Sequence, residues 1–318
     1  MLQQIILPKF NNRLEEELIN LFHESELPLH FNKTGNKEFT NYQRFSIIIL
    51  FIRSKKSLRD FIDELAESKW VSFLGLKKIP QKSTLHDWLK IFSMKIIRKI
   101  SKVLLPNEIK LTSIDGTGFD SWKRSRQYEH KIGDPYMPYA KVDLFIDVKT
   151  LAIIDFSLIN KKAHDVKVAE QIFNRNSIKG FTILADKGYD SEPLHEIVRD
   201  KGALMYAPVR KMDKRGSKKN KPSGRYRRIC MNLPEFMGLR SLSESVNSSL
   251  KRRQITALRS KKIYMKQREF GWHIVLYNIR RKLIVENNQQ SKINYQTFFY
   301  LIVIICPFRT EPLKPIFL

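Results

Sequence analysis

The stretch from about residue 109 to residue 207 constrains the fold more than any other part of the chain. Three short β-rich runs come first, "IKLTSIDGTGF", "AKVDLFIDVKT" and "LAIIDFSLI", and a hairpin turn is expected near Thr150. The strand-like runs "GFTILAD" and "ALMYAPV" then alternate with the helical patterns "EQIFNRNSI" and "SEPLHEIVRDKG". A meander followed by alternating strands and helices predicts an α/β fold, a mixed sheet flanked by helices.

The first hundred residues have the apolar spacing of helices. Ser57 is expected to cap a helix that begins with "LRDFIDEL", and Ser83 or Thr84 is expected to cap the helix that follows. Short basic helices joined by tight turns suit a helix-turn-helix-like DNA-binding unit, and they suit an ordinary helical bundle equally well. We therefore expect an N-terminal helical domain over residues 1–105.

The charge of the chain points to a polyanionic partner. Its 318 residues include 58 Lys and Arg against 32 Asp and Glu, which gives a net charge of +26. Such an excess favours nucleic acid over membranes. The run at residues 210–228 holds ten of these cations and one Asp, and it predicts an exposed basic loop that grips phosphates. Its central cations are Lys214, Arg215, Lys218 and Lys219.

Cysteine and apolar content exclude several classes of protein. Two cysteines cannot form a disulfide framework or a multi-cysteine zinc site, which fits a reduced, cytoplasmic setting. The longest apolar runs, residues 45–52 and 298–306, are far shorter than the roughly 20 residues of a membrane helix. We expect no membrane partner.

Two aspartates share one local pattern. Asp115 and Asp186 each follow a short apolar run, and a glycine comes one or two residues later. We expect the first strand to end at Asp115 and Gly116, and a second strand to end at Asp186. Strand ends of α/β sheets are where reactive groups collect, so neighbouring strands would bring these carboxylates together. A divalent cation such as Mg²⁺ or Mn²⁺ would relieve their repulsion. The alternative is that each Asp caps the next turn.

A third acid follows on a predicted helix. Arg240, Glu244 and Lys251 are four and seven residues apart, so a helix would present them on one face. Alone, this spacing is typical of a surface ion-pair ladder. In the order Asp, Asp, then Glu between two cations, it favours a shared carboxylate site over a surface ladder.

These motifs resemble those of the DDE transposases of the IS4/IS5-type insertion-sequence class. "SIDGTGF" resembles the first-aspartate motif, and "ILADKGYDSE" resembles the second. Arg240, Glu244 and Lys251 have the spacing of the family's Tyr-Arg-Glu-Lys signature, and "AHDVKVAEQIF" resembles the stretch before the second aspartate strand. The similarity runs from about residue 40 to residue 285.

The resemblance implies an RNase H-like catalytic domain over residues 106–290 that cuts at insertion-sequence ends and joins the freed 3′-hydroxyl to target DNA. Asp115 would bridge two Mg²⁺ ions, for which Mn²⁺ would substitute, while Asp186 and Glu244 would hold one each. Residues 1–105 would bind the transposon ends, and two copies would form a homodimer in a synaptic complex with double-stranded DNA. A nucleoid-associated protein of a prokaryote is expected. The DNA-binding residues would be Arg240, Lys251, Arg252, Arg253 and the four cations of the basic loop. Trp122 is a further candidate, because an aromatic side chain can stack on an unpaired base near the cut, and the alternative is an ordinary core or surface tryptophan.

One position departs from the signature. Met237 stands where the family has its tyrosine, so that side chain's contact with DNA cannot be carried over. Two other functions stay open: an RNase H-like nuclease that does not join strands, and an inactive DNA-binding protein descended from a transposase. The tail at residues 291–318 has no assigned role.

Overall fold

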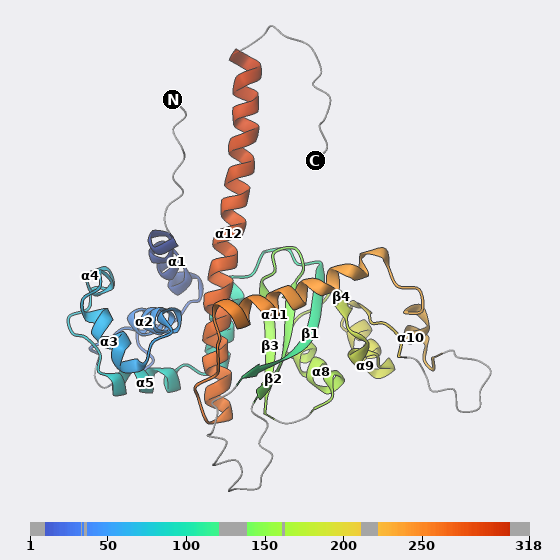
Figure 1. Cartoon of the computed structure of the whole chain (residues 1–318), viewed down its shortest axis with the longest axis horizontal. Helices are drawn as coiled ribbons and strands as arrows, with labels where there is room; N and C mark the ends of the chain where they lie inside the picture. Colours follow the sequence, from blue (N-terminus) through green and yellow to red (C-terminus); the bar gives the residue numbers. More distant parts are fainter. Residues whose placement is uncertain are drawn as a thin grey trace.

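The computed structural model describes residues 10–32, 34, 37–120, 139–160, 163–210 and 222–305, and Figure 1 shows their arrangement. A helical region and a mixed sheet lie on either side of one long helix, α12 (Ile263–Ile305). In the described residues, no helix is apolar over a length that would cross a bilayer.

Five strands form the sheet, in the order β3-β2-β1-β4-β5. The first three strands of the chain pair antiparallel, and β4 and β5 run parallel to β1. This order and these orientations are those of an RNase H-like sheet, so the predicted fold class and hairpin are confirmed. The strands are β1 (Leu111–Asp120), β2 (Tyr139–Asp147), β3 (Ile153–Ile159), β4 (Thr182–Ala185) and β5 (Leu204–Tyr206).

Helices cover both faces of the sheet. On one face, α8 (Asp165–Arg175) and α9 (Glu192–Asp200) bury apolar side chains against β1, β2 and β4. On the other face, α11 (Leu242–Arg253) and α12 pack against β1, β2 and β3. A short helix, α10 (Arg225–Ile229), and two 3₁₀ turns, η1 (Lys187–Tyr189) and η2 (Glu235–Ser241), complete this part.

The N-terminal region is helical, as predicted. Ser57 accepts a hydrogen bond from the Asp60 N–H and caps α3, which confirms its expected role. The cap expected at Ser83 or Thr84 is wrong, because Gln81 has the extended backbone of a cap residue and the chain is already helical at Lys82. The helices are α1 (Phe10–Glu24), α2 (Asn41–Ser54), α3 (Leu58–Ala66), α4 (Trp70–Phe73), α5 (Lys82–Ile91) and α6 (Met94–Val103).

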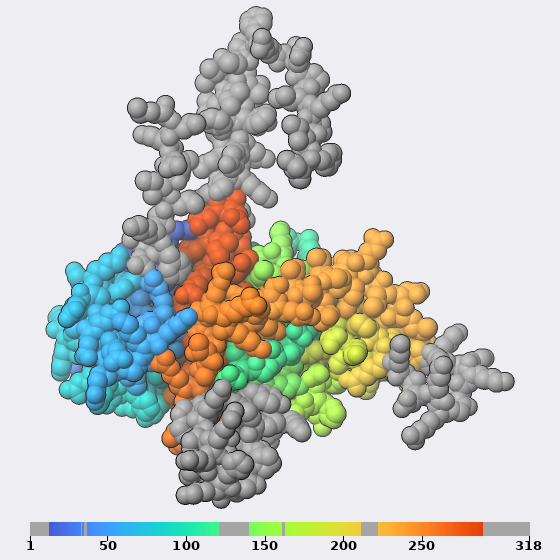
Figure 2. Space-filling view, in the orientation of Figure 1, coloured from blue at the N-terminus to red at the C-terminus, as the bar shows by residue number. Residues whose placement is uncertain are grey.

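Helix α12 belongs to two hydrophobic cores. Trp272 and Leu276 are buried among the N-terminal helices, whereas Phe270 and Ile274 are buried against the sheet and α11. Each pair is four residues apart, so two faces of one helix serve two cores. Figure 2 shows the outcome, with the α11–α12 connection in orange lying directly against the blue N-terminal helices.

Candidate functional site

Strand register brings Asp115 and Asp186 together. Ile114 in β1 pairs in parallel with Ala185, the last residue of β4, and Asp115 and Asp186 directly follow this pair. Neighbouring strands lie about 4.8 Å apart, so the two carboxylates leave the sheet side by side at the same level. Asp186 comes directly after β4 and begins η1.

The prediction that β1 ends at Asp115 and Gly116 is wrong. The strand continues to Asp120, because β2 pairs with it antiparallel as far as the Asp120–Tyr139 pair. Only the parallel pairing with β4 stops beside Asp115. Asp115 therefore lies in the middle of β1, at the point where the parallel pairing with β4 ends.

Arg240 links the other two acids. Its guanidinium lies 4.0 Å from Oδ1 of Asp186 and 3.4 Å from Oε1 of Glu244. Arg240 belongs to η2, and Glu244 lies in the first turn of α11. Both carboxylates are well exposed, at 44% and 59% of their side-chain surface, whereas Arg240 is 25% exposed. One cation thus offsets the mutual repulsion of acids from two elements.

Asp115 is the most buried of the three acids. Burial raises its pKa, Arg240 and the Gly116 N–H oppose that rise, and the charges of Glu244 and Asp186 add to it. The amide of Asn247 donates a hydrogen bond of 3.1 Å to Oδ2 of Asp115. Sequence reasoning missed Asn247, although its place three residues after Glu244 puts it on the same helix face.

The cations of α11 lie along the same face of the sheet. Lys251 Nζ donates a 2.6 Å hydrogen bond to the Thr117 hydroxyl and lies 5.4 Å from the centre of the Phe119 ring. Residues 115, 117 and 119 alternate toward α11, which explains why one helix contacts all three. Arg252 and Arg253 are exposed at the end of the helix. Trp122, Lys214, Arg215, Lys218 and Lys219 lie outside the described residues.

The opposite face of the sheet holds a further acid, which no sequence motif singled out. Asp143 is fully buried and pairs with Gly116 across the strands. Tyr189 donates a 2.6 Å hydrogen bond to its Oδ1 atom, yet burial raises the pKa of Asp143 to about 6. A Cβ atom at position 116 would lie 3.0 Å from that oxygen, so a larger residue there would require the Asp143 side chain to shift by a few tenths of an ångström.

Two more acids of the "DKGYDSE" motif hold the ends of the basic run. Asp190 accepts two 2.7 Å hydrogen bonds from Arg227 and one of 2.9 Å from the Arg210 N–H. Burial raises the pKa of Asp190, but these hydrogen bonds outweigh it and leave the pKa below its usual range. Glu192 accepts hydrogen bonds from the first N–H groups of α10. The motif therefore anchors both flanks of residues 211–221, which lie outside the described part of the chain.

The three acids are suitable donors for a hard cation, but they do not form a ready-made cage. Within the described residues, no three His, Cys, Asp or Glu side chains gather closely enough to hold a metal ion. Arg240 stands between Asp186 and Glu244 and makes the ion pairs that a divalent ion would otherwise make. Carboxylate oxygens remain the ligands that Mg²⁺ and Mn²⁺ prefer.

Comparison with known proteins identifies the sheet region. The family model described as "Transposase DDE domain" matches residues 106–279, more than half of the 318 residues. This range includes Asp115, Asp186 and Glu244 together with both faces of the sheet. No curated protein gives a significant match.

Solved structures of transposases are distantly similar. A piggyBac transposase synaptic complex with hairpin DNA shares 15% identity over 89% of this chain and 74% of its own, with a TM-score of 0.45. A Drosophila P element transposase strand transfer complex shares 14% over 62% and 48%, with a TM-score of 0.32. A pre-cleavage Mos1 transpososome shares 11% over 89% of both chains, with a TM-score of 0.21. These likenesses are too low to carry an argument about the site.

Proposed function

Because the chain belongs to the transposase DDE domain family, we propose that it is a DNA transposase of the IS4/IS5-type insertion-sequence class. It cuts at the ends of its element and joins the freed 3′-hydroxyl to target DNA. The observation that carries this proposal is the pairing of β1 with β4, which sets Asp115 beside Asp186 within reach of Arg240 and Glu244.

Asp115, Asp186 and Glu244 would hold divalent ions, Mg²⁺ or Mn²⁺, two in the active complex. When bound, such ions activate water and stabilise the leaving oxygen of a phosphodiester. Asp186 and Glu244 are exposed and would exchange Arg240 for such ions, which would leave its guanidinium to bind a phosphate oxygen. The hydrogen bond from Asn247 would keep the Asp115 carboxylate oriented.

The cations of α11 would bind the DNA backbone. Lys251 is held in place by Thr117, and Arg252 and Arg253 extend the positive charge beyond it. Contacts of this kind are independent of sequence and weaken steeply as salt rises. The four cations of the basic loop and Trp122 are proposed DNA contacts as well, on the sequence pattern alone.

The division of labour follows the same proposal. Residues 1–105 would bind transposon ends, residues 106–290 would carry out the chemistry, and two copies would hold two ends in a synaptic homodimer. The tail at residues 291–318 has no proposed part in this.

A cleavage assay tests the function. The full chain is mixed with a plasmid that carries the gene's own flanking DNA, with Mg²⁺, with Mn²⁺ or with EDTA, and Asp186→Asn is run beside it. We expect cuts at the flanks that need metal and that fall at least a hundredfold in the variant, because loss of a residue that only supports a metal ligand already costs about 10–100-fold. Asp200→Asn, a matched change at an exposed position of α9, should cut normally.

Three other outcomes would change the proposal. Cuts without joined products would make the protein a nuclease. Binding to the flanks without cuts, in wild type and variant alike, would make it a DNA-binding relic, and Met237→Tyr would then test whether the missing tyrosine is the cause. Cuts that do not depend on metal would mean that Asp115, Asp186 and Glu244 do not act as metal ligands in cleavage.

A further inference from the structure

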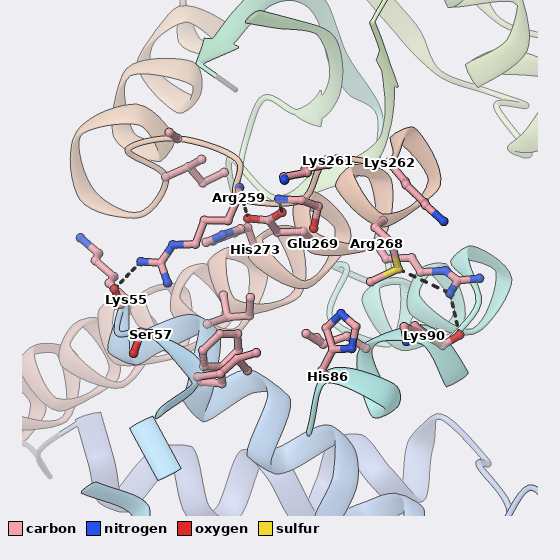
Figure 3. A pocket seen from close by; sticks show the side chains of 18 of the residues that line it. Lys55, Ser57, His86, Lys90, Arg259, Lys261, Lys262, Arg268, Glu269 and His273 are labelled. Atoms are coloured by element: carbon pink, nitrogen blue, oxygen red, sulfur yellow. Dashed lines mark hydrogen bonds between the residues drawn. The ribbon is translucent and has the colours of Figure 1, made fainter. Parts of the chain in front are cut away.

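A pocket of about 660 Å³ lies away from the carboxylates, between the N-terminal helices and the α11–α12 connection. Figure 3 shows it from close by, with α2, α3 and α5 on one side and residues 254–273 on the other. The size is that of sites that take small organic ligands, about 300–1,000 Å³. The proposed chemistry at Asp115 and Asp186 makes no use of it.

The walls of the pocket are mainly apolar, and its rim is cationic. Phe51, Leu89 and Tyr264 are among the apolar and aromatic wall residues. Tyr264 is 43% exposed, and Arg268 lies 5.4 Å from the centre of its ring. Six cations lie around them: Lys55, Lys90, Arg259, Lys261, Lys262 and Arg268.

Acids are fewer than cations among the described residues that line the pocket. Glu269 is the one acid among the described residues that line it, and its carboxylate accepts hydrogen bonds from the N–H groups of Arg259 and Ser260. Lys90 pairs with Asp87 on its own helix. Arg259 and Arg268 instead donate to backbone carbonyls of residues 55, 56 and 90, which fixes both guanidinium groups without an ion pair to an acid in the described part of the chain.

An apolar cavity with fixed cations at its mouth fits one ligand chemistry well, an aromatic ring joined to phosphates. Bases stack on aromatic side chains, and cations bind the phosphates on either side of a base. A paired duplex would use only the cations, since its bases are stacked inside. The cavity therefore favours a nucleotide that has left the stack.

Helix α11 connects this pocket to the carboxylates. Glu244 lies in its first turn, and Gln254, directly after its last residue, lines the pocket. Ten residues of helix span about 15 Å. At about 3.4 Å per nucleotide of duplex, this length corresponds to four or five base pairs. Lys251, Arg252 and Arg253 lie along the way, so a strand that leaves the carboxylates along α11 reaches the pocket.

We propose that this pocket binds one unpaired nucleotide of the DNA end, four or five positions from the bond at Asp115 and Asp186. The base packs against Tyr264 and the apolar wall, and the phosphates on either side contact Lys55 and Lys262. The distance to the cut rests on the proposed transposase function. The ligand class rests only on the shape and charge of the pocket.

The test is a binding measurement without cleavage. The full chain, in EDTA, is titrated into a duplex with one unpaired 2-aminopurine and into the same duplex with an abasic residue at that position. We expect the base to improve binding about tenfold, which is within the range for base–aromatic stacking, and its fluorescence to change on binding. A free mononucleotide at millimolar concentration should compete weakly, because it lacks the second phosphate contact.

Three variants locate the effect. Ala257→Trp fills the pocket from a half-buried lining position and should bring the ratio of the two affinities close to one. Tyr264→Ala removes the stacking surface and should lower the same ratio several-fold. Lys77→Gln removes an exposed charge outside the pocket and should leave the ratio unchanged. Circular dichroism checks that each variant is folded.

Equal affinity for the base and the abasic duplex would overturn the proposal, and so would a folded Ala257→Trp that keeps the preference. Failure of the proposed function is recognised separately. A protein that prefers the unpaired base but never cuts its flanking DNA retains the pocket and loses the transposase assignment. A protein that cuts its flanking DNA but shows no base preference would keep the transposase assignment and lose the proposed nucleotide pocket.

Discussion

Two acids of one motif, Asp186 and Asp190, are four residues apart and have opposite surroundings. The Asp186 side chain is 44% exposed, and its one ion pair, to Arg240, is 4.0 Å long. The Asp190 side chain is fully buried and accepts three hydrogen bonds of 2.7–2.9 Å. In the proposed function Asp186 would have to exchange its partner, and its long, exposed ion pair allows this, whereas Asp190 is fully paired with residues on both flanks of the basic run. One short motif thus contains a loosely held acid and a fully paired one.

The largest effect is expected when Asp190, the buried and fully hydrogen-bonded acid, is replaced. Asp190→Asn leaves Arg227 without its charged partner, and breaking a buried ion pair typically costs about 3–5 kcal/mol. We expect the free energy of unfolding, measured in urea, to fall by about 3 kcal/mol. Asp200→Asn, at an exposed position, is the control. A loss below about 1 kcal/mol would show that Asp190 does not anchor the basic run.

The next effect concerns Asp143, the buried acid on the other face of the sheet. Its pKa is about 6 in the folded protein and about 3.8 when unfolded, so the folded state binds its proton more tightly. This group stabilises the fold below about pH 4, and that contribution is lost as the pH rises through 6. It amounts to on the order of 3 kcal/mol.

Asp143→Asn should remove this dependence. Urea unfolding at pH 4 and at pH 6.5 would then show the variant gaining stability relative to wild type as the pH rises. A difference between the two proteins that stays constant across this range would mean that Asp143 ionises normally.

A smaller effect is expected at Asn247. Asn247→Ala removes the hydrogen bond that orients Asp115, and loss of a hydrogen bond to a metal-binding carboxylate typically costs about tenfold or more in activity. The cleavage assay with flanking DNA measures it. Ser249→Ala, on the same helix, is a control that leaves Asp115 untouched. Full activity in Asn247→Ala would show that this hydrogen bond belongs only to the metal-free protein and is not needed for cleavage.

The smallest effect is expected in the stability of Asp186→Asn. This change removes only a long, exposed ion pair, so the free energy of unfolding should shift by less than about 0.5 kcal/mol while cleavage is lost. A stability loss as large as that of Asp190→Asn would erase the distinction between the two acids.

Local pattern was enough to predict the strands, the hairpin and most helices of the sheet region. It was not enough for the length of β1, because the pairing of Gly116 and Asp120 with β2 sets where that strand ends. The order of Asp115, Asp186 and Glu244 along the chain indicated a shared site. The contacts of Asp115 with Asn247 and of Asp143 with Tyr189 join segments far apart in the sequence. The helix position of Asn247 pointed to the site, whereas no sequence pattern pointed to the contact of Asp143 with Tyr189.

Helix α12 limits how this protein can be divided into fragments or recombined with other domains. Helices α1 to α6 bury apolar side chains around Trp272 and Leu276, which come from the other end of the sheet region. A fragment that stops at residue 105 would lack the middle of its own core. Grafting these N-terminal helices onto another protein would therefore require residues 272–283 as well, and exchange of the two parts in evolution would have to carry this helix with both.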